Sequence, residues 1–267
     1  MTSPLLDDPR HLRAEIRAGR FDRSTTGVGG NALQANLAIL PEAEAAEFLR
    51  FCQKNPQPCP LIAVGEPGDP SLPTLGEGID LRFDVPRYHI WQDGVMVGEV
   101  ADLADHWRDD LVSFAIGCSF SFEAALAEAG IPLRHQENGT VVPMYRSGLQ
   151  TRPAGRFHGP VVVSMRPMPV RDAIEAVKIC DRFPLAHGAP VHIGDPAEIG
   201  IADVMRPDYG DAPEIRAGEV PVFWACGVTP QAAIAQAKPG FAISHAPGHM
   251  LVTDIPAPQA ERRIAAV

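Results

Sequence analysis

The sequence contains no run of 18 apolar residues, the length that a membrane-spanning helix requires. Residues 1–21, MTSPLLDDPRHLRAEIRAGRF, carry acidic side chains early and lack the apolar core of a secretory signal. Positive charge is also scarce, and the formal net charge is −10. An acidic chain repels phosphate backbones and anionic lipid surfaces. We therefore expect a cytoplasmic protein that binds neither membranes nor nucleic acid.

Several motifs of cofactor and metal binding are missing too. No GxGxxG fingerprint follows a strand, and no GxxxxGK[ST] motif is present. The cysteines form no CxxC pair, which removes the support for a thiolate zinc site. We expect no cofactor, with a divalent metal ion left open, and reduced thiols at all five cysteines. These are odd in number and irregularly spaced: Cys52, Cys59, Cys118, Cys180 and Cys226.

Proline and glycine, by contrast, are abundant, with 27 and 24 residues spread between apolar runs. This distribution predicts many tight loops rather than disorder. Short apolar segments that predict strands alternate with segments of helical periodicity. The predicted strands cover residues 61–64, 111–116, 141–145, 160–165, 221–225, 241–244 and 250–253, with a hairpin over 88–100, and the predicted helices cover 11–21, 41–52, 122–129, 170–180 and 229–237.

This alternation predicts an α/β fold with a mixed-sheet core domain. We expect that core domain to be discontinuous, formed by residues 1–120 and 186–267. A smaller α+β subdomain of β-β-α order is expected as an insertion at residues 121–185. No internal repeat divides the chain further, so we treat it as one unit.

Two predicted turns share one design. LVSFAI-GCS leads into a helix, and PVFWA-CGVTP leads into another, so Cys118 and Cys226 each lie between a strand end and a helix start. A helix start offers free N–H groups that attract carboxylates and lower the pKa of a nearby thiol. The structural alternative is that both cysteines are buried core residues and that Ser119, Ser121 and Thr229 are only helix caps.

Charged residues suggest how an anionic ligand could be held. The alternation in DLRFD places Asp80, Arg82 and Asp84 on one side of an extended segment, which favours a structural ion-pair network. The alternative is that Arg82, with Asp84 beside it, clamps a substrate carboxylate. Arg166, just after a buried strand, is a second candidate clamp. Glu123, near a helix start, is either a surface acid or a proton-transfer group.

Histidines gather in two loops. His187, His192 and Asp195 lie in HGAPVHIGDP, a spacing without the helical geometry of HExxH zinc sites. We consider His187 and His192 as candidate acid–base residues, with loop structure as the alternative. In SHAPGHM, His245 ends a predicted strand and is a better candidate for contact with a substrate than His249.

These segments together resemble a known family. The motifs that carry the resemblance are PQPCPLIAVGEPG, IDLRFDVPRYHIWQDG, SFAIGCSFSFEAAL, VVSMRPM, HGAPVHIGDP, PVFWACGVTPQ and SHAPGHMLVTD. They resemble the YcsI-like hydro-lyase family, which includes a domain of mitochondrial D-glutamate cyclase, over residues 31–254. The resemblance implies a two-part α/β fold and a lyase that dehydrates D-glutamate to 5-oxo-D-proline. The sequence departs from the family at Phe83 and Ser244, where threonine is usual.

This activity fits the candidate residues. Arg82 and Arg166 would hold carboxylates, and the helix starts at Cys118 and Cys226 would stabilise oxyanion charge. A thiol, Glu123 or a histidine would move the proton. Two rivals stay open: a cofactor-independent racemase that uses both thiols, and a non-catalytic module that binds carboxylates. In each case the partner is a small anionic amino or hydroxy acid, and a homo-oligomer is left open.

Overall fold

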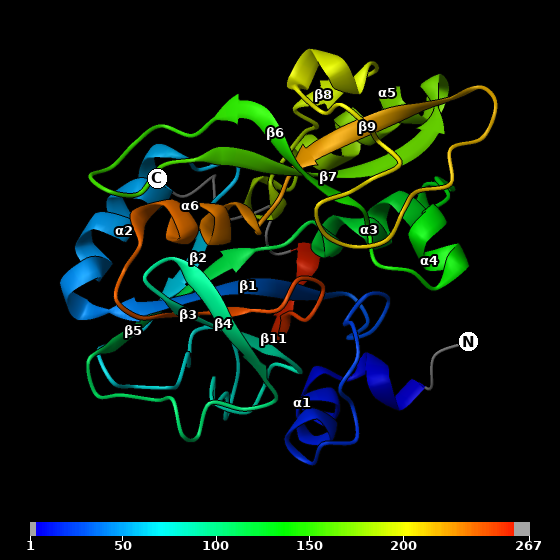
Figure 1. The fold of residues 1–267 in the computed structure, drawn as a ribbon. Helices are drawn as coiled ribbons and strands as arrows, with labels where there is room; N and C mark the ends of the chain where they lie inside the picture. The colour runs from blue at the N-terminus through cyan, green and yellow to red at the C-terminus, as the bar shows by residue number, and fades with distance from the viewer. Residues whose placement is uncertain (1–3, 259–267) are drawn as a thin grey trace.

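The computed structural model describes residues 4–258, and in it two β-sheets lie above and below a layer of helices (Figure 1). Every strand pairing among these residues is antiparallel. The larger sheet has seven strands in the order β2-β5-β1-β10-β3-β4, with β11 paired to β1. Its strands are β1 (Ala32–Pro41), β2 (Leu61–Val64), β3 (Tyr88–Gln92), β4 (Val95–Val100), β5 (Leu111–Gly117), β10 (Ala242–His245) and β11 (Leu251–Pro256).

Strand β1 is the centre of the larger sheet. Its residues 33–40 are all buried, as expected for the near-continuous apolar run in ALQANLAILP. It pairs with β5 along one side, and with β10 and β11 along the other. The sequence analysis did not include this strand, in which the polar residues Gln34 and Asn36 interrupt the apolar run.

The smaller sheet has four strands in the order β6-β7-β9-β8. The strands are β6 (Met144–Gln150), β7 (Pro160–Pro169), β8 (His192–Ile193) and β9 (Glu219–Ala225). Two of them, β8 and β9, come from the segment expected to belong to the core domain. The strands of this sheet therefore extend beyond the predicted insertion at 121–185.

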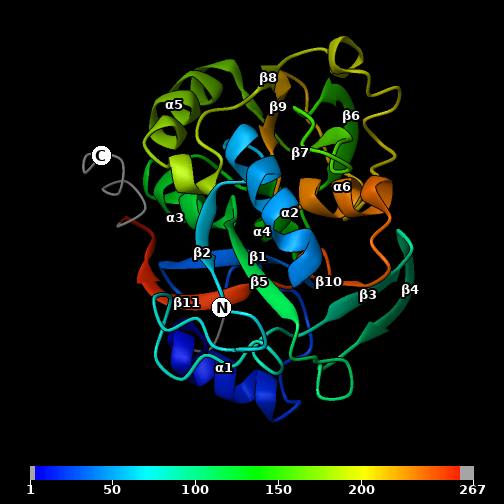
Figure 2. The same ribbon diagram turned by 90° about the vertical axis from the view of Figure 1, so that its left-hand side faces the viewer.

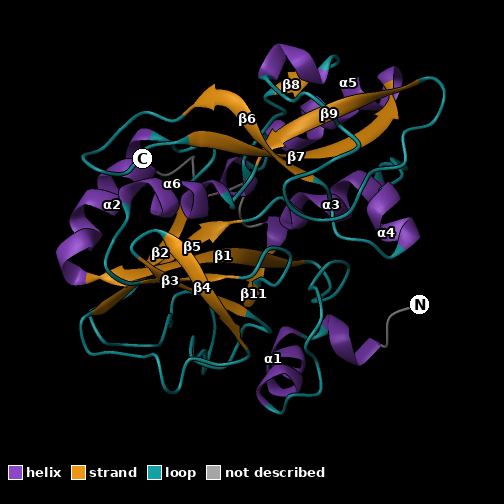
Figure 3. Ribbon diagram, in the orientation of Figure 1, coloured by secondary structure: helices purple, strands orange, loops and turns teal. Residues whose placement is uncertain are grey.

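Helices fill the space between the two sheets (Figures 2 and 3). α6 packs on β7 and α3 on β1, and α5 packs with α3 on the same face of the smaller sheet, against β7 and β9. α1 lies below the larger sheet, against β11. The helices are α1 (Pro9–Arg17), α2 (Glu42–Lys54), α3 (Phe120–Glu128), α4 (Arg134–Asn138), α5 (Val170–Asp181) and α6 (Thr229–Ala237), with the 3-10 turns η1 (Pro4–Asp7), η2 (Pro184–Ala186) and η3 (Pro196–Ile199).

The α/β class is confirmed, but the expected mixed sheet is not found among residues 4–258, where no parallel pair occurs. A parallel pair needs a helical crossover that returns the chain in the same direction. Here the strands that follow helices are antiparallel to their neighbours, as β2, which follows α2, is to β5. No helix in this part of the chain has both the length and the apolar character needed to cross a membrane.

Candidate functional site

The two helices of the middle layer that follow the cysteine motifs start as the sequence predicts. Cys118 and Ser119 connect β5 to α3, and Cys226, Gly227 and Val228 connect β9 to α6. Both cysteines are buried, with 6% and 7% exposure. Burial and the nearby Cys226 both disfavour the thiolate form of Cys118. The two thiols therefore lie in one region.

A glycine beside each cysteine lets another segment approach the turn. A Cβ on Gly117 would lie 1.5 Å from the backbone oxygen of Leu185, and one on Gly227 would lie 1.9 Å from Nδ2 of Asn36. Neither glycine has a left-handed φ, so the requirement is space rather than backbone conformation. The first turn is thus pressed against η2 and the second against β1.

The thiols are protonated rather than activated. Burial raises the pKa of the Cys118 thiol well above its usual range, although the N–H of Phe120 acts against this. Burial likewise raises the pKa of Cys226 to about 11, against the opposing effect of the Val228 N–H. The Cys226 Sγ donates to Sδ of Met144 at 3.5 Å. The expectation that the helix starts lower these pKa values is wrong, because desolvation outweighs the N–H donors.

Glu123 and Arg166 form a buried ion pair next to these turns. Arg166 Nε donates to Glu123 Oε1 at 3.0 Å, and its Nη2 donates to the same oxygen and, at 3.0 Å, to Ser119 Oγ. The guanidinium also lies 5.2 Å and 5.3 Å from the ring centres of Phe122 and Trp224. Arg166 is 1% exposed, and Glu123 balances its charge inside the protein. This environment suits a positioning residue better than a substrate clamp.

The short helix α4 adds two residues to this pair that the sequence analysis missed. His135 Nε2 lies 3.0 Å from Glu123 Oε1, and Gln136 Nε2 donates to Glu123 Oε2 at 2.6 Å. Burial would raise the pKa of Glu123, but His135 and Arg166 lower it to about 2. Glu123 is therefore an ionised carboxylate that accepts three hydrogen bonds, from Arg166 and Gln136, and lies within ion-pair distance of His135. We call these four residues the Glu123 cluster. RHQEN has no apolar periodicity, so only the residue types themselves could have indicated a site.

The Glu123 cluster borders a cleft lined by residues of α3, α4 and the loop before β1. Two hollows of about 390 Å³ and about 250 Å³ share Gly27 and Gln136, and we call them together the α3–α4 cleft. This size suits a small metabolite. The polar lining residues are Asp7, Arg23, Ser24, Thr26, Asn31, Gln34, Ser121, Glu123, His135, Gln136 and Thr140.

The hydroxyl residues of the two turns do not act as helix caps. Ser121 Oγ accepts the backbone N–H of Gln34 at 3.1 Å and lines the α3–α4 cleft. Thr229 Oγ1 accepts the N–H of Val162 at 3.0 Å and donates to the carbonyl of Cys226 at 2.7 Å. No side chain caps the start of either α3 or α6. Thr229 therefore connects β7 to the second turn, and only Ser121 faces the cleft.

His187 and His245 are both buried and both neutral. His187 Nδ1 lies 2.8 Å from the carbonyl oxygen of Gln57, and burial lowers its pKa to about 4. His245 Nδ1 accepts the backbone N–H of Leu37 at 3.1 Å, and burial lowers its pKa to about 3. His187 lies near the Cys118 turn, since Arg166 and Gly117 also influence it. His245 instead connects β10 to β1.

His192 lies apart from these groups. It belongs to β8, where its Nε2 is 2.8 Å from the backbone oxygen of Asp195 and its ring packs on Phe223. Among residues 4–258 no three His, Cys, Asp or Glu side chains gather as a metal site would require. The expected absence of a cofactor stays a prediction.

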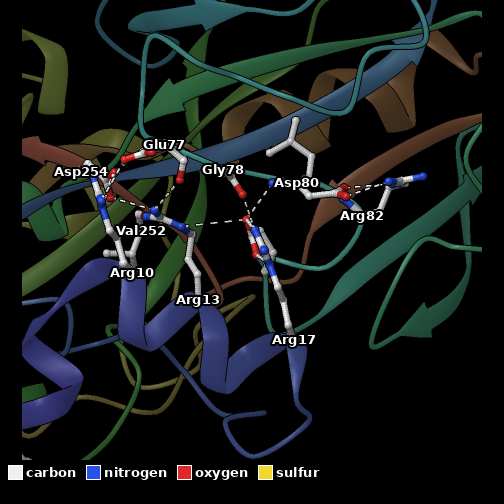
Figure 4. Close-up of polar contacts among 12 residues, drawn as sticks. Arg10, Arg13, Arg17, Glu77, Gly78, Asp80, Arg82, Val252 and Asp254 are labelled. Carbon is white, nitrogen blue, oxygen red and sulfur yellow. Dashed lines mark hydrogen bonds and ion pairs between the residues drawn. The ribbon is translucent and has the colours of Figure 1, made fainter.

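Arg82 and Asp84 belong to an ion-pair group with Arg17 and Asp80, of which Figure 4 labels Arg17, Asp80 and Arg82. Arg82 Nη2 contacts Asp80 Oδ2 at 2.7 Å, whereas the fully buried Asp84 accepts from Arg17 Nη2 at 2.6 Å. Asp84 N–H donates to the carbonyl of Asp80, so this segment is a turn and not the extended strand that we expected. The group connects α1 to the turn and shares no lining residue with the α3–α4 cleft.

The fold and the site together define a two-sheet α/β protein with a buried charged cluster beside a cleft of metabolite size. Residues 112–254 match the D-glutamate cyclase family, and the chain belongs to this family. A protein of Bordetella petrii is 63% identical over 243 residues, which cover 91% of this chain and 92% of that protein. A protein of Verminephrobacter eiseniae is 62% identical over 248 residues, covering 93% of this chain and 90% of its own. Both relatives are named "Putative hydro-lyase".

Proposed function

We propose that this protein is a hydro-lyase that removes water from a small amino acid with two carboxylates. D-Glutamate, which would cyclise to 5-oxo-D-proline, is the first substrate to test. Family membership and the printed names of the two relatives support the reaction class. The observation that carries the proposal is the Glu123 cluster, which places an ionised carboxylate and a histidine at the wall of a metabolite-sized cleft.

The reaction forms a lactam and releases water, and both changes require protons to be moved. The amino nitrogen attacks the γ-carboxyl carbon, an N–C bond forms and one C–O bond breaks. The ammonium group loses two protons in becoming the lactam N–H, and the departing oxygen gains two in becoming water. A catalyst must therefore hold the ammonium group, accept its protons and return them to the oxygen.

The Glu123 cluster has the groups for this task. Glu123 is ionised, so it can attract the ammonium group and fix the ring of His135 through Nε2. His135 lines the cleft and is the group we assign to proton transfer. A carboxylate that orients a proton-transferring histidine is a recurrent catalytic arrangement. Arg166 positions Glu123, and Gln136 Nε2 holds its second oxygen.

The test is incubation of the protein with D- and L-glutamate in D₂O, followed by mass spectrometry. We expect 5-oxoproline from one enantiomer and at least a 100-fold loss of rate in His135→Gln, because acid–base residues typically contribute 10²- to 10⁴-fold. The matched control is His158→Gln, at an exposed position outside the cleft. Deuterium at the α-carbon without loss of water would instead support the two-thiol racemase. Stabilisation by glutamate without any turnover would support a binding module.

A further inference from the structure

No ion pair within the described part of the fold depends on an arginine at position 23. It is exposed in the loop before β1 and lines the α3–α4 cleft. Among the ion pairs of residues 4–258 none includes Arg23. Its guanidinium lies 5.0 Å from the ring centre of Phe21, a buried residue. This cation–π contact holds the charge in place while its N–H donors stay free.

Arg23 is the one lysine or arginine among the lining residues, and it lies at the exposed side of the hollow that it shares with His135. Asp7, also exposed, lines the other hollow. Glu123 and His135 are 2% and 5% exposed and form the inner wall, where Arg166 balances the charge of Glu123. An anionic group of a ligand in the first hollow is therefore attracted to Arg23 at its outer side.

We propose that Arg23 binds the α-carboxylate of the substrate and so determines which acids the cleft accepts. This inference rests on the proposed function, in which the γ-carboxyl group reacts. The reacting carboxyl and the ammonium group must lie at His135 and Glu123, since proton transfer needs hydrogen-bond distance. The α-carboxylate does not react, and it is left to the exposed side, where the planar guanidinium can bind both of its oxygens.

The experiment measures equilibrium binding by calorimetry with three ligands: D-glutamate, D-2-aminobutyrate, which lacks the γ-carboxylate, and 4-aminobutyrate, which lacks the α-carboxylate. We expect Arg23→Gln to weaken the first two about 10- to 100-fold, the usual worth of a charge-assisted hydrogen bond. Arg23→Lys should fall between, because it keeps the charge and loses the planar fork. Binding of 4-aminobutyrate should not change.

The matched control is Arg50→Gln, another exposed arginine without an ion pair, on α2 and outside the cleft. The inference would be overturned if Arg23→Gln weakened all three ligands equally or bound D-glutamate with wild-type affinity. It would also be overturned if the wild-type protein bound no D-glutamate. The proposed function is judged separately by turnover. Arg23-dependent binding without product would refute the function alone, and turnover with an unchanged KM in Arg23→Gln would refute the role of Arg23 alone.

Discussion

At the scale of single residues, Gly117 and Gly227 carry no reactive group, yet the placement of both buried thiols depends on them. Each lets a neighbouring segment approach to a distance that any side chain would block. The sequence shows these glycines plainly beside Cys118 and Cys226. It does not show that Leu185 and Asn36 are the partners, because nothing local indicates which distant segment will meet a turn.

We expect Gly117→Ala to lower the free energy of unfolding by about 3 kcal/mol, as overpacking of a tight contact does. The added methyl group would collide with backbone at Leu185, which cannot rotate away as a side chain could. Urea unfolding measures the change. Gly240→Ala is the control, since no atom lies within 4 Å of its Cβ position. Equal stability of the two variants would contradict the account of this turn.

Thiol chemistry offers a second test at this scale. All five cysteines are buried and free, and burial raises the pKa of both Cys118 and Cys226. Because the thiolate is the reactive form, a disulfide reagent at pH 8 should modify the native protein at least about 100-fold more slowly than the urea-unfolded chain. A fast native thiol that disappears in Cys118→Ala would speak against this and in favour of the racemase.

At the scale of elements, α1 is held by charge as well as by its apolar face. Leu12 and Ile16 pack on Val252, while three arginines of α1 meet carboxylates (Figure 4). Arg13 is the most buried of the three, at 2%, and its Nη2 contacts Asp254 Oδ1 at 2.8 Å. Arg10 contacts the same carboxylate from an exposed position.

Arg13 and Arg10 contact the same carboxylate but differ in burial, so comparing them tests whether burial determines how much each contact stabilises the protein. We expect Arg13→Ala to cost about 3 kcal/mol of unfolding free energy, because it removes a buried side chain together with its contact to Asp254 and its hydrogen bond to the Val252 carbonyl. Arg10→Ala should cost less than about 1 kcal/mol, as exposed pairs do. Urea unfolding of both variants at low and high salt makes the comparison. Similar losses in the two variants would show that burial does not decide the strength of these contacts.

The limits of sequence reasoning also appear at this scale. Periodicity and turn residues predicted α5, α6, β5 and β9 to within a few residues, because each is an apolar segment with clear ends. The sequence did not predict that Glu123 pairs with Arg166, although both residues were candidates, since they come from different elements. α4 lacks an apolar face and was missed together with His135. Chemistry-bearing residues could thus be named, but their partners depended on the tertiary fold.

At the scale of the whole molecule, buried neutral histidines make stability depend on pH. The folded pKa is about 4 for His187 and about 3 for His245, against about 6.5 in an unfolded chain. Below pH 6.5 the unfolded state therefore binds more protons, and stability falls as the pH decreases. The loss levels off once the pH is below the folded pKa of each group.

We expect each of these histidines to cost about 2 kcal/mol between pH 7 and pH 5. His187→Asn should remove its share of that slope, and asparagine tolerates the left-handed backbone at this position, where φ is 77°. His158→Asn, at an exposed site, is the control. Unfolding free energies across pH 5 to 7.5 give the result, and an unchanged slope in His187→Asn would refute the assignment.

The position of β1 also sets the order in which the molecule can form. Ala38 pairs with Phe114 on one side and with Ser244 on the other, so the strand that anchors the larger sheet has a partner very distant along the chain. Proteins rich in such pairings fold slowly. A nascent chain would carry β1 with one edge of unpaired backbone N–H and C=O groups until residues beyond 240 leave the ribosome. Pairing of that edge with other chains would then compete with completion of the native sheet.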